Sequence, residues 1–234
     1  MTATEQWESF WRAAPPDPGS VFWDADPAHT AQRHLPLFAP HFGGGLPVVD
    51  AGCGNGTQTA FLAARFAPVL GVDLSPAAIE LARGLPDAGG AEFRVLDLTD
   101  ARAAAALHAE LGDSHVYLRG VLHQCTPQDR DRVAASLAVL LGERGRAFVV
   151  EPAAAAKAEL LGLMRRAEGP PASLAAVFGH GIAPTEMADT ALAALCEAAG
   201  LAVLDAGREP LRTTEHGPDG GPVELPSQWL VVGR

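Results

Sequence analysis

The sequence VVDAGCGNGTQT, residues 48–59, joins a short apolar run to a stretch of helix-forming residues. We expect a strand over 47–49 and a helix over 57–66. The three glycines at alternate positions, Gly52, Gly54 and Gly56, allow a tight turn and the close approach of a ligand to the backbone. The first turn of the helix points unpaired N–H groups at the same place. This loop therefore predicts a site for a nucleotide-like ligand that carries a carboxylate or phosphate.

Carboxylates follow three predicted strands at regular intervals. Asp50 ends the first strand, Asp73 follows a strand over 68–72, and Asp97 follows a strand over 92–96. The steps of 23 and 24 residues between these positions fit one strand, one helix and two short loops. The aspartates are thus predicted at the carboxyl ends of consecutive parallel strands, where open α/β sheets bind ligands.

The glycine loop, the sequence GVDLSP over 71–76 and the sequence LDL over 96–98 together resemble the class I S-adenosylmethionine-dependent methyltransferases. The resemblance implies S-adenosyl-L-methionine as cofactor and S-adenosyl-L-homocysteine as product. It implies that Asp73 holds the ribose hydroxyls, that Asp97 faces the adenine amino group, and that the loop passes under the methionine end. The implied cofactor-binding residues are Asp50, Gly52, Cys53, Gly54, Asn55, Gly56, Asp73, Leu74, Asp97, Leu98 and Arg119. The alternative is that the aspartates cap the following helices.

A nicotinamide or flavin site is the main rival interpretation of this loop. Its fingerprint has glycines at relative positions 1, 3 and 6. In this chain the sixth position is Thr57, and the third glycine comes one residue earlier. The spacing therefore favours the methyltransferase interpretation.

The region from a predicted strand over 115–118 to a strand over 146–150 is similar to the small-molecule O-methyltransferases of plants and of polyketide pathways. The matched residues are LRGVLH, 118–123, and GRAFVVE, 145–151. The resemblance implies that His123 is the general base and that Glu151 positions it, and imidazole suits this task because its ordinary pKa is near neutrality. The chain departs from the family where Gln124 and Cys125 replace the usual Asp-Trp. His123 as a pocket-lining or structural histidine, and Glu151 as a pocket-lining residue, stay open.

Aromatic residues near the amino terminus and after the fifth strand are candidates for the acceptor side of the site. A helix over 4–13 would place Trp7, Phe10 and Trp11 on one face, either as core packing or as a lid. Arg119 could hold an acidic substrate or pair with Asp97 or Glu151. The candidate substrate-binding residues are Trp11, Phe22, Trp23, Arg119, His123, Phe178 and His180.

The pattern of elements predicts one domain over 1–234 with a Rossmann-like fold. Its parts are an N-terminal helical or lid segment (1–45), a cofactor-binding core (46–151), an inserted substrate cap after the fifth strand (152–184), and a C-terminal helix and strands (185–234). We expect a mostly parallel seven-stranded sheet that ends in an antiparallel hairpin. The expected elements of the last part are a helix over 185–199, strands over 201–204 and 229–232, and a polar connection around 213–221.

Composition limits the partners. The formal net charge of -11 argues against a nucleic-acid partner, and the chain lacks an Asn/Asp-Pro-Pro-Tyr signature of amino-adenine methylation after the fourth strand. The three cysteines match no metal or disulfide spacing, and we expect reduced thiols in a cytoplasmic protein with no metal. No run approaches the roughly 18 consecutive apolar residues of a membrane span. Abundant Ala, Gly, Pro and Arg suggest a bacterial source, and a monomer or homodimer is expected.

Taken together, the sequence predicts S-adenosylmethionine-dependent methyl transfer to a small-molecule metabolite, with oxygen of a hydroxyl or carboxylate as the favoured acceptor, and analogy with the family suggests a biosynthetic pathway. The alternatives are a small-molecule N-methyltransferase and a protein that binds the cofactor without methylating. A nicotinamide-dependent oxidoreductase is less favoured.

Overall fold

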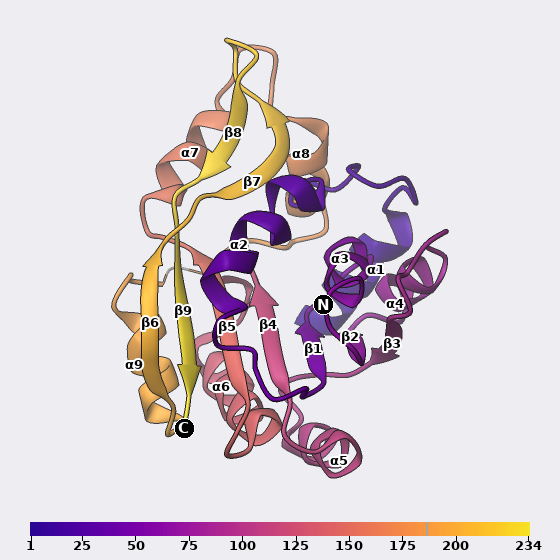
Figure 1. Cartoon of the computed structure of the whole chain (residues 1–234). Helices are drawn as coiled ribbons and strands as arrows, with labels where there is room; N and C mark the ends of the chain where they lie inside the picture. Colours follow the sequence, from indigo (N-terminus) through magenta and orange to yellow (C-terminus); the bar gives the residue numbers. More distant parts are fainter. Residues whose placement is uncertain (186) are drawn as a thin grey trace.

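The computed structural model describes residues 1–185 and 187–234 and contains a seven-stranded sheet in the order β3-β2-β1-β4-β5-β9-β6 (Figure 1). Strands β1 to β5 are parallel, and β9 pairs antiparallel with both β5 and β6. This arrangement confirms the predicted fold class and the antiparallel ending. The strands are β1 (Val48–Ala51), β2 (Val69–Asp73), β3 (Glu92–Val95), β4 (His115–Arg119), β5 (Arg146–Pro152), β6 (Ala202–Arg208) and β9 (Ser227–Gly233).

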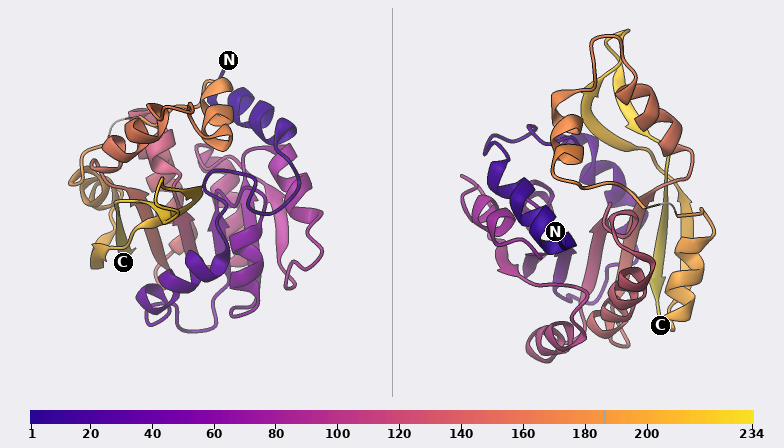
Figure 2. Two further views of the ribbon diagram at one scale, coloured as in Figure 1. Left: turned by 90° about the horizontal axis from the view of Figure 1, so that it is seen from above. Right: turned by 180° about the vertical axis from the view of Figure 1, so that it is seen from behind.

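Helices cover both faces of the sheet (Figure 2). Side chains of α5, α6 and α9 pack with Val49, Val116 and Val149 on one face, and side chains of α2 and α3 pack with Tyr117 and Phe148 on the other. The described α-helices are α1 (Ala3–Ala13), α2 (Ala31–Phe38), α3 (Thr57–Ala63), α4 (Pro76–Arg83), α5 (Ala101–Leu111), α6 (Pro127–Leu141), α7 (Ala156–Met164), α8 (Ala172–Gly179) and α9 (Ala191–Ala198).

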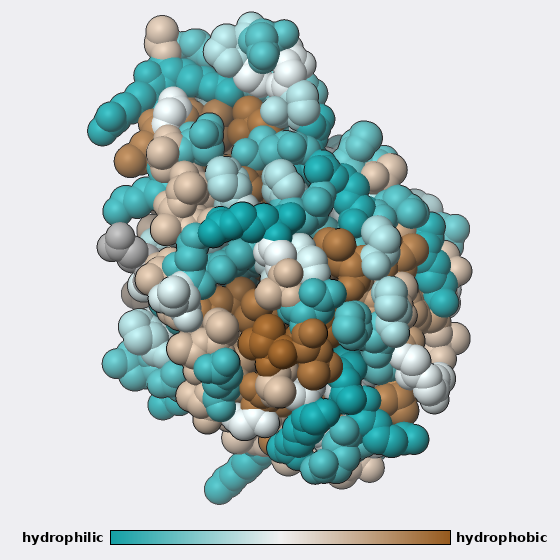
Figure 3. All heavy atoms as spheres, turned by 60° about the vertical axis from the view of Figure 1, so that its left-hand side comes forward, coloured by the Kyte–Doolittle hydropathy of each residue, from teal (hydrophilic) through white to brown (hydrophobic). Residues whose placement is uncertain are grey.

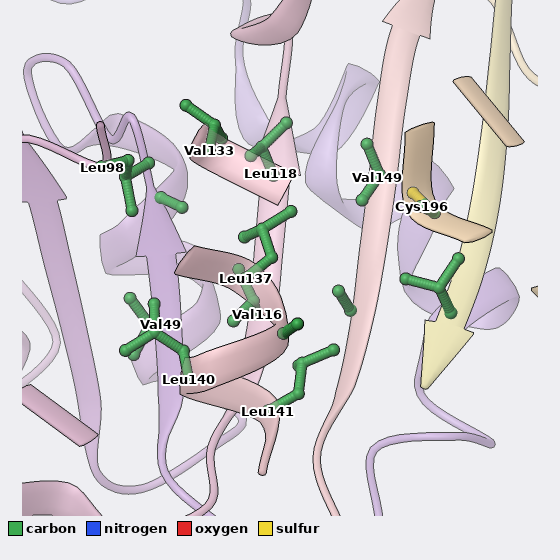
Figure 4. Packing of buried hydrophobic residues seen from close by; sticks show 14 of the residues in the cluster. Val49, Leu98, Val116, Leu118, Val133, Leu137, Leu140, Leu141, Val149 and Cys196 are labelled. Carbon is green, nitrogen blue, oxygen red and sulfur yellow. The ribbon is translucent and has the colours of Figure 1, made fainter. Parts of the chain in front are cut away.

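The α6 face shows how the sheet is fixed. Thr126 caps α6 by accepting the backbone N–H of Asp129, and Pro127 fits the first turn because no N–H is needed there. Leu137, Leu140 and Leu141 are fully buried against β1, β4 and β5 (Figure 4). Burying a side chain of this size stabilises the fold by about 1.5–3 kcal/mol. The carboxyl ends of β4 and β5 are consequently held in a fixed relation.

A cap rises beyond the carboxyl ends of the strands (Figure 1). It contains α7, α8 and a separate two-stranded sheet of β7 (Leu211–His216) and β8 (Pro222–Leu225). The polar connection expected around 213–221 contains the end of β7 and a short turn before β8, and neither strand was predicted. These strands bury few apolar side chains, Leu211 and Leu225 among them. Their sequences therefore lack the clear alternation of apolar and polar residues that predicts a strand.

The predicted helix after the cap also differs from the structure. The helix expected over 185–199 begins only at Ala191; Glu186 lies outside the described residues. Before it, the backbone N–H of Thr185 bonds the carbonyl of His123 at 2.7 Å and Met187 is buried in the core, so tertiary contacts replace the first helical turns. A 3-10 turn, η1 (Pro27–His29), lies directly before α2 and is separated from it by Thr30.

Strand β1 runs on to Ala51 and β5 to Pro152, further than predicted, so Asp50 and Glu151 are each followed by one more strand residue. Both residues belong to the paired part of the sheet, because Asp50 pairs with Gly71 of β2 and Glu151 pairs with Gln228 of β9. The surface in Figure 3 mixes hydrophilic and hydrophobic residues. The large apolar side chains exposed among the described residues, Met1, Val95, Leu161 and Leu204, lie on different elements.

Candidate active site

The glycine loop sits at the carboxyl end of β1 and leads into α3. Gly52, Gly54 and Gly56 have φ values of 76°, 55° and 81°, which side-chain-bearing residues rarely adopt. A Cβ on Gly52 would lie 2.5 Å from Val121 Cγ2, and one on Gly54 would lie 2.7 Å from the indole of Trp11. Both conformation and space therefore require glycine at these two positions.

Asp73 is held against this loop. Its Oδ2 accepts the backbone N–H of Gly54 at 3.0 Å, and its Oδ1 accepts that of Ser75 at 2.9 Å. Burial raises the pKa of Asp73 to about 6, although these backbone donors oppose the shift. Each carboxylate oxygen keeps a further lone pair, so the group can still accept hydrogen bonds from a vicinal diol.

The other two aspartates make local contacts as well. Asp50 Oδ2 accepts the hydroxyl of Thr59 at 2.6 Å, and burial raises the pKa of Asp50 to about 6. Asp97 Oδ1 accepts the backbone N–H and the hydroxyl of Thr99 at 2.8 and 2.7 Å. Cofactor contacts of Asp50 and Asp97 stay predictions.

The helix-capping alternative is wrong for these aspartates. Residues other than the predicted ones cap the following helices: Gly56 precedes α3, Ser75 caps α4 and Asp100 caps α5. Asp50, Asp73 and Asp97 nevertheless all lie at or near the carboxyl edge of the sheet, as the sequence spacing predicted.

Beside the loop, β4 and β5 bring His123 and Glu151 together. His123 lies in a short 3-10 turn, η2 (Leu122–Gln124), and its Nδ1 is 2.8 Å from Oε2 of Glu151. The Glu151 side chain is fully buried and also accepts the backbone N–H groups of Val121, Leu122 and His123 at 2.7–3.2 Å. Glu151 therefore fixes both the turn and the imidazole ring.

This geometry sets the tautomer of His123. An ionised carboxylate only accepts hydrogen bonds, so the proton of the neutral ring belongs on Nδ1 and the lone pair on Nε2. Nε2 is 2.9 Å from the side-chain nitrogen of Gln124, which donates to it. The Gln124 oxygen is buried and has no hydrogen-bond partner. Sequence analysis noted Gln124 only as a departure from the family pattern and missed its contact with His123.

The N-terminal helix covers the glycine loop. Trp11 is buried over Gly54, and Oε2 of Glu8 accepts the hydroxyl of Ser75 at 2.6 Å and the backbone N–H of Ala77 at 3.0 Å. The bond from Ser75 is the main reason that the pKa of Glu8 is lowered. These contacts dock α1 on the amino end of α4, and sequence analysis missed Glu8.

The N-terminal helix α1 also contacts the cap. Ser9 Oγ lies 2.9 Å from His180 Nδ1, and the Gln6 amide donates to the carbonyl of Gly181 at 3.0 Å. The ring of His180 also packs edge-on against Phe10. His180 therefore joins α1 to the segment after α8.

The predicted aromatic residues divide into two groups. Trp11 packs with Phe10, and Trp23 lies against both, in an aromatic cluster next to the loop. Phe22 is buried in the cluster that also contains Phe38 and Phe148, and Phe178 packs against that cluster. The structure thus places Trp11 against Gly54 with Trp23 packed on Trp11, and Phe22 and Phe178 in the packing between cap and sheet.

Arg119 and the loop residue Asn55 both contact the N-terminal segment. Arg119 Nη1 donates to the carbonyl of Trp23 at 3.1 Å, and the Asn55 amide donates to Oδ2 of Asp24 at 2.7 Å. No ion pair joins Arg119 to Asp97 or Glu151, so the suggested pairing with either acid is wrong. Sequence analysis also missed Asp24, which lies in a proline-rich stretch without periodicity.

The described residues give little support for a reactive cysteine or a metal site. Burial raises the pKa of the Cys53 thiol well above its ordinary value, which disfavours a thiolate nucleophile in the loop. Among residues 1–185 and 187–234, no three His, Cys, Asp or Glu side chains are grouped so that they could hold a metal ion. In the same residues no helix is both long and apolar enough to cross a membrane.

Comparisons with known proteins agree with this geometry. The family described as "Methyltransferase domain" matches residues 48–145. A crystal structure of a SAM-dependent methyltransferase from Anabaena variabilis superimposes with a TM-score of 0.92 and 29% sequence identity, covering 100% of this chain and 96% of that one. A structure from work on the conversion of a disulfide bond into a thioacetal group during echinomycin biosynthesis has a TM-score of 0.71 and 23% identity over 99% of this chain and 92% of that one, which supports the fold.

Two curated relatives match shorter stretches. Magnesium-protoporphyrin O-methyltransferase of Rhodobacter capsulatus is 40% identical over 78 residues, 32% of this chain and 35% of the relative. Trans-aconitate 2-methyltransferase of Methylobacterium radiotolerans is 46% identical over 59 residues, 24% of this chain and 21% of the relative. The matches thus span about a third and a fifth of the length of these relatives. Together with the sheet order and the glycine loop, these findings show that residues 48–145 form a methyltransferase domain and that the chain has the fold of S-adenosylmethionine-dependent methyltransferases.

Proposed function

We propose that the protein binds S-adenosylmethionine, the cofactor of its family, and transfers the methyl group to a small molecule, with oxygen as the favoured acceptor. The observation that carries the acceptor assignment is the His123–Glu151 pair beside the glycine loop. It presents a neutral imidazole lone pair at the carboxyl edge of the sheet, where a hydroxyl could give up its proton.

The residues around the loop fit the cofactor. Positions 52 and 54 accept only glycine, because their φ values are positive and Val121 and Trp11 pack directly on the backbone, and the loop is thereby held in a tight turn beside Asp73. Asp73 offers acceptor lone pairs beside Gly54 for a ribose diol. When bound, the cofactor supplies an activated methyl group on a positively charged sulfur. We assign Leu74 and Leu98, next to Asp73 and Asp97, to the walls around the adenine.

The chain itself would orient the acceptor, exclude water and receive a proton. Glu151 holds Nδ1–H of His123 and stabilises the imidazolium that forms when Nε2 takes the proton of a hydroxyl. Since Gln124 donates to Nε2 in the resting geometry, its amide must turn before Nε2 can accept that proton. Turning exchanges the two ends of the amide, and the Gln124 oxygen can then accept the new Nε2–H.

The buried aromatic cover contributes by excluding water from the loop. Trp11 and Trp23 lie in this cover, and His180 closes it toward the cap. We propose these three residues, with Arg119, as the part of the cover that borders the acceptor. Phe22 and Phe178 would act by packing between the cap and the sheet.

The names of the curated relatives support the substrate class. One is an O-methyltransferase acting on magnesium-protoporphyrin, and the other methylates trans-aconitate. Both are small molecules, and the net charge of -11 is unfavourable for binding nucleic-acid phosphates. These similarities cover only part of each relative, and the proposal takes from them only a small-molecule acceptor.

The test is transfer of isotopically labelled methyl from S-adenosylmethionine into fractionated metabolite extracts. We expect label in small-molecule fractions, and the stability of the product to mild alkali separates a carboxylate ester, which is hydrolysed, from an ether, which survives. Mass spectrometry then separates an O-methyl from an N-methyl product. Label found only on protein or nucleic acid, or no transfer by folded protein that binds the cofactor, would contradict the proposal and, in the second case, favour a non-methylating binding protein.

A further inference from the structure

Arg130 is a buried arginine of α6 that bonds two backbone carbonyls from distant parts of the chain. The residue is 8% exposed, its Nε donates to the carbonyl of Leu122 at 2.9 Å, and its Nη2 donates to the carbonyl of Thr185 at 2.8 Å. Leu122 begins the turn η2 that carries His123, and Thr185 lies where the chain returns from the cap to the core. The guanidinium thus bridges this turn and the end of the cap.

A backbone hydrogen bond joins the same two segments. The N–H of Thr185 donates to the carbonyl of His123 at 2.7 Å. The turn is also held from β5, because buried Glu151 accepts the backbone N–H of Leu122 at 2.7 Å and lies 2.8 Å from Nδ1 of His123. The position of the His123 ring therefore depends on β5, on Thr185 and on the side chain of Arg130.

The chemistry of arginine suits this bridge. A guanidinium presents up to five N–H donors in a planar, rigid fork, so it can bond two carbonyls in different directions at once. A lysine ammonium carries all its donors on one atom at the end of a flexible chain. The backbone of Arg130 is itself fixed, because its N–H donates to the carbonyl of the capping residue Thr126 at 2.9 Å. The fork is therefore aimed from a rigid helix.

We propose that Arg130 is a positioning residue for His123, which it keeps against Glu151 by tying the turn to Thr185. The proposal rests on the proposed function, because it takes His123 as the base. Without the fork the two carbonyls lose their donors, and the turn can move away from Glu151. The proton of the neutral ring then divides between Nδ1 and Nε2. Only the molecules that keep the lone pair on Nε2 can accept a proton there.

The ring nitrogens of His123 report the position of the turn without an acceptor or cofactor. Nitrogen NMR of the isotopically labelled full chain distinguishes protonated from unprotonated ring nitrogens, and His123→Ala identifies the signals. The variants are Arg130→Lys, which keeps the charge but loses the fork, and Arg130→Met, which removes the donors. Arg132→Gln is the matched control, because Arg132 is exposed on the same helix and pairs with Asp129. We expect Nδ1 protonated in the wild type and the control, and a mixture of tautomers in both Arg130 variants.

Turnover separates positioning of the base from a general effect on the fold. With the acceptor fraction identified by label transfer, Arg130→Lys should lower kcat about tenfold, because a displaced base contributes less. The affinity for S-adenosylhomocysteine should stay within about twofold. In the His123→Ala background, Arg130→Lys should change kcat by less than about twofold, because the group that it positions is absent. Arg132→Gln should change neither quantity, and thermal unfolding checks that each variant is folded.

Wild-type ring signals or wild-type kcat in Arg130→Lys would overturn the proposal. An equal loss of kcat with and without His123, or an Arg130→Lys variant that does not fold, would overturn it as well, because Arg130 would then only maintain the fold. These results leave the proposed function standing. If Arg130→Met alone fails to fold, Arg130→Lys decides. If His123→Ala is as active as the wild type, or folded wild-type protein transfers no methyl group, the proposed function fails and the positioning role fails with it.

Discussion

Residues 48–97 and residues 1–24 meet at the glycine loop, and they reach it by different routes through the sequence. The first region is built of strand–loop–helix units in which each functional position follows its own strand. The second is attached by single contacts between distant residues. The bond between Asn55 and Asp24 spans 31 residues, and that between Ala77 and Glu8 spans 69.

The difference explains which part of the site carries a sequence signature. A loop that must turn at positive φ needs glycine, and a strand end that must present a carboxylate needs an acid at a set position. A cover needs only side chains of suitable size and charge that meet the loop in space. The same contact could be made from many places in the sequence.

The largest effect should separate chemistry from cofactor binding. His123→Ala removes the proposed base without touching Asp73 or the loop, so turnover should fall at least roughly a hundredfold, while the affinity for S-adenosylhomocysteine stays within about twofold. Initial rates with the labelled acceptor and calorimetry measure the two quantities. His29→Ala, an exposed position outside the site, is the control. Unchanged turnover in the His123 variant would exclude the base assignment.

The contact between the two regions can be broken directly at Gly54. Gly54→Ala would place a Cβ 2.7 Å from the Trp11 indole at a φ of 55°, so either the loop or α1 must move. Strain of this kind costs about 1–3 kcal/mol, and we expect S-adenosylhomocysteine to bind about tenfold or more weakly, with a change in tryptophan fluorescence. Gly43→Ala meets open space and should change neither. Wild-type affinity and fluorescence in the Gly54 variant would mean that Trp11 does not rest on the loop.

The pH dependence of cofactor binding tests residues 48–97 separately from residues 1–24. Burial raises the pKa of Asp73 to about 6, and a ribose diol is bound best by the ionised carboxylate. Affinity for S-adenosylhomocysteine should therefore fall as pH falls through about 6, to about a tenth at pH 5 of its value at pH 8. Calorimetry at both pH values measures this ratio, and Asp73→Asn should abolish the dependence. A constant affinity in the wild type would remove Asp73 from the binding equilibrium.

The folding stability of the unliganded protein should depend on pH in the opposite sense. The pKa of Asp50 rises from 3.8 to about 6 because the group is buried. The folded state therefore holds this proton more tightly than the unfolded chain, and the resulting stability is lost as pH rises from about 4 to about 6. Asp50 thus favours the fold at acid pH, whereas Asp73 favours the ligand at neutral pH.

Much of the cofactor side could be predicted from sequence, and the reasons are local. The glycine spacing and the acids at 50, 73 and 97 follow the period of the strand–helix unit, and the sheet edge brings them together as expected. The pair of His123 and Glu151 could be predicted only through the family resemblance, because their contact depends on the register of β4 against β5.

The remaining residues of the site do not follow the period of the strand–helix units in the sequence. Glu8 caps the amino end of α4 from another helix, and Asp24 lies in a proline-rich loop whose path is set by Asn55 and Gly19. Gln124 follows a predicted residue, but its contact with His123 depends on a 3-10 turn held by buried Glu151. The hairpin of β7 and β8 was missed because each strand buries only part of one face.

The most direct test of the central claim is calorimetric titration of S-adenosylhomocysteine into wild-type protein, Asp73→Asn and Asp87→Asn. Asp87 is exposed between α4 and β3 and bonds only the nearby Gly89 backbone, so it controls for loss of a surface acid. We expect saturable binding by the wild type and the Asp87 variant, and a loss of at least about tenfold in the Asp73 variant. No binding by folded wild-type protein freed of bound ligand, or full affinity in the Asp73 variant, would contradict the account.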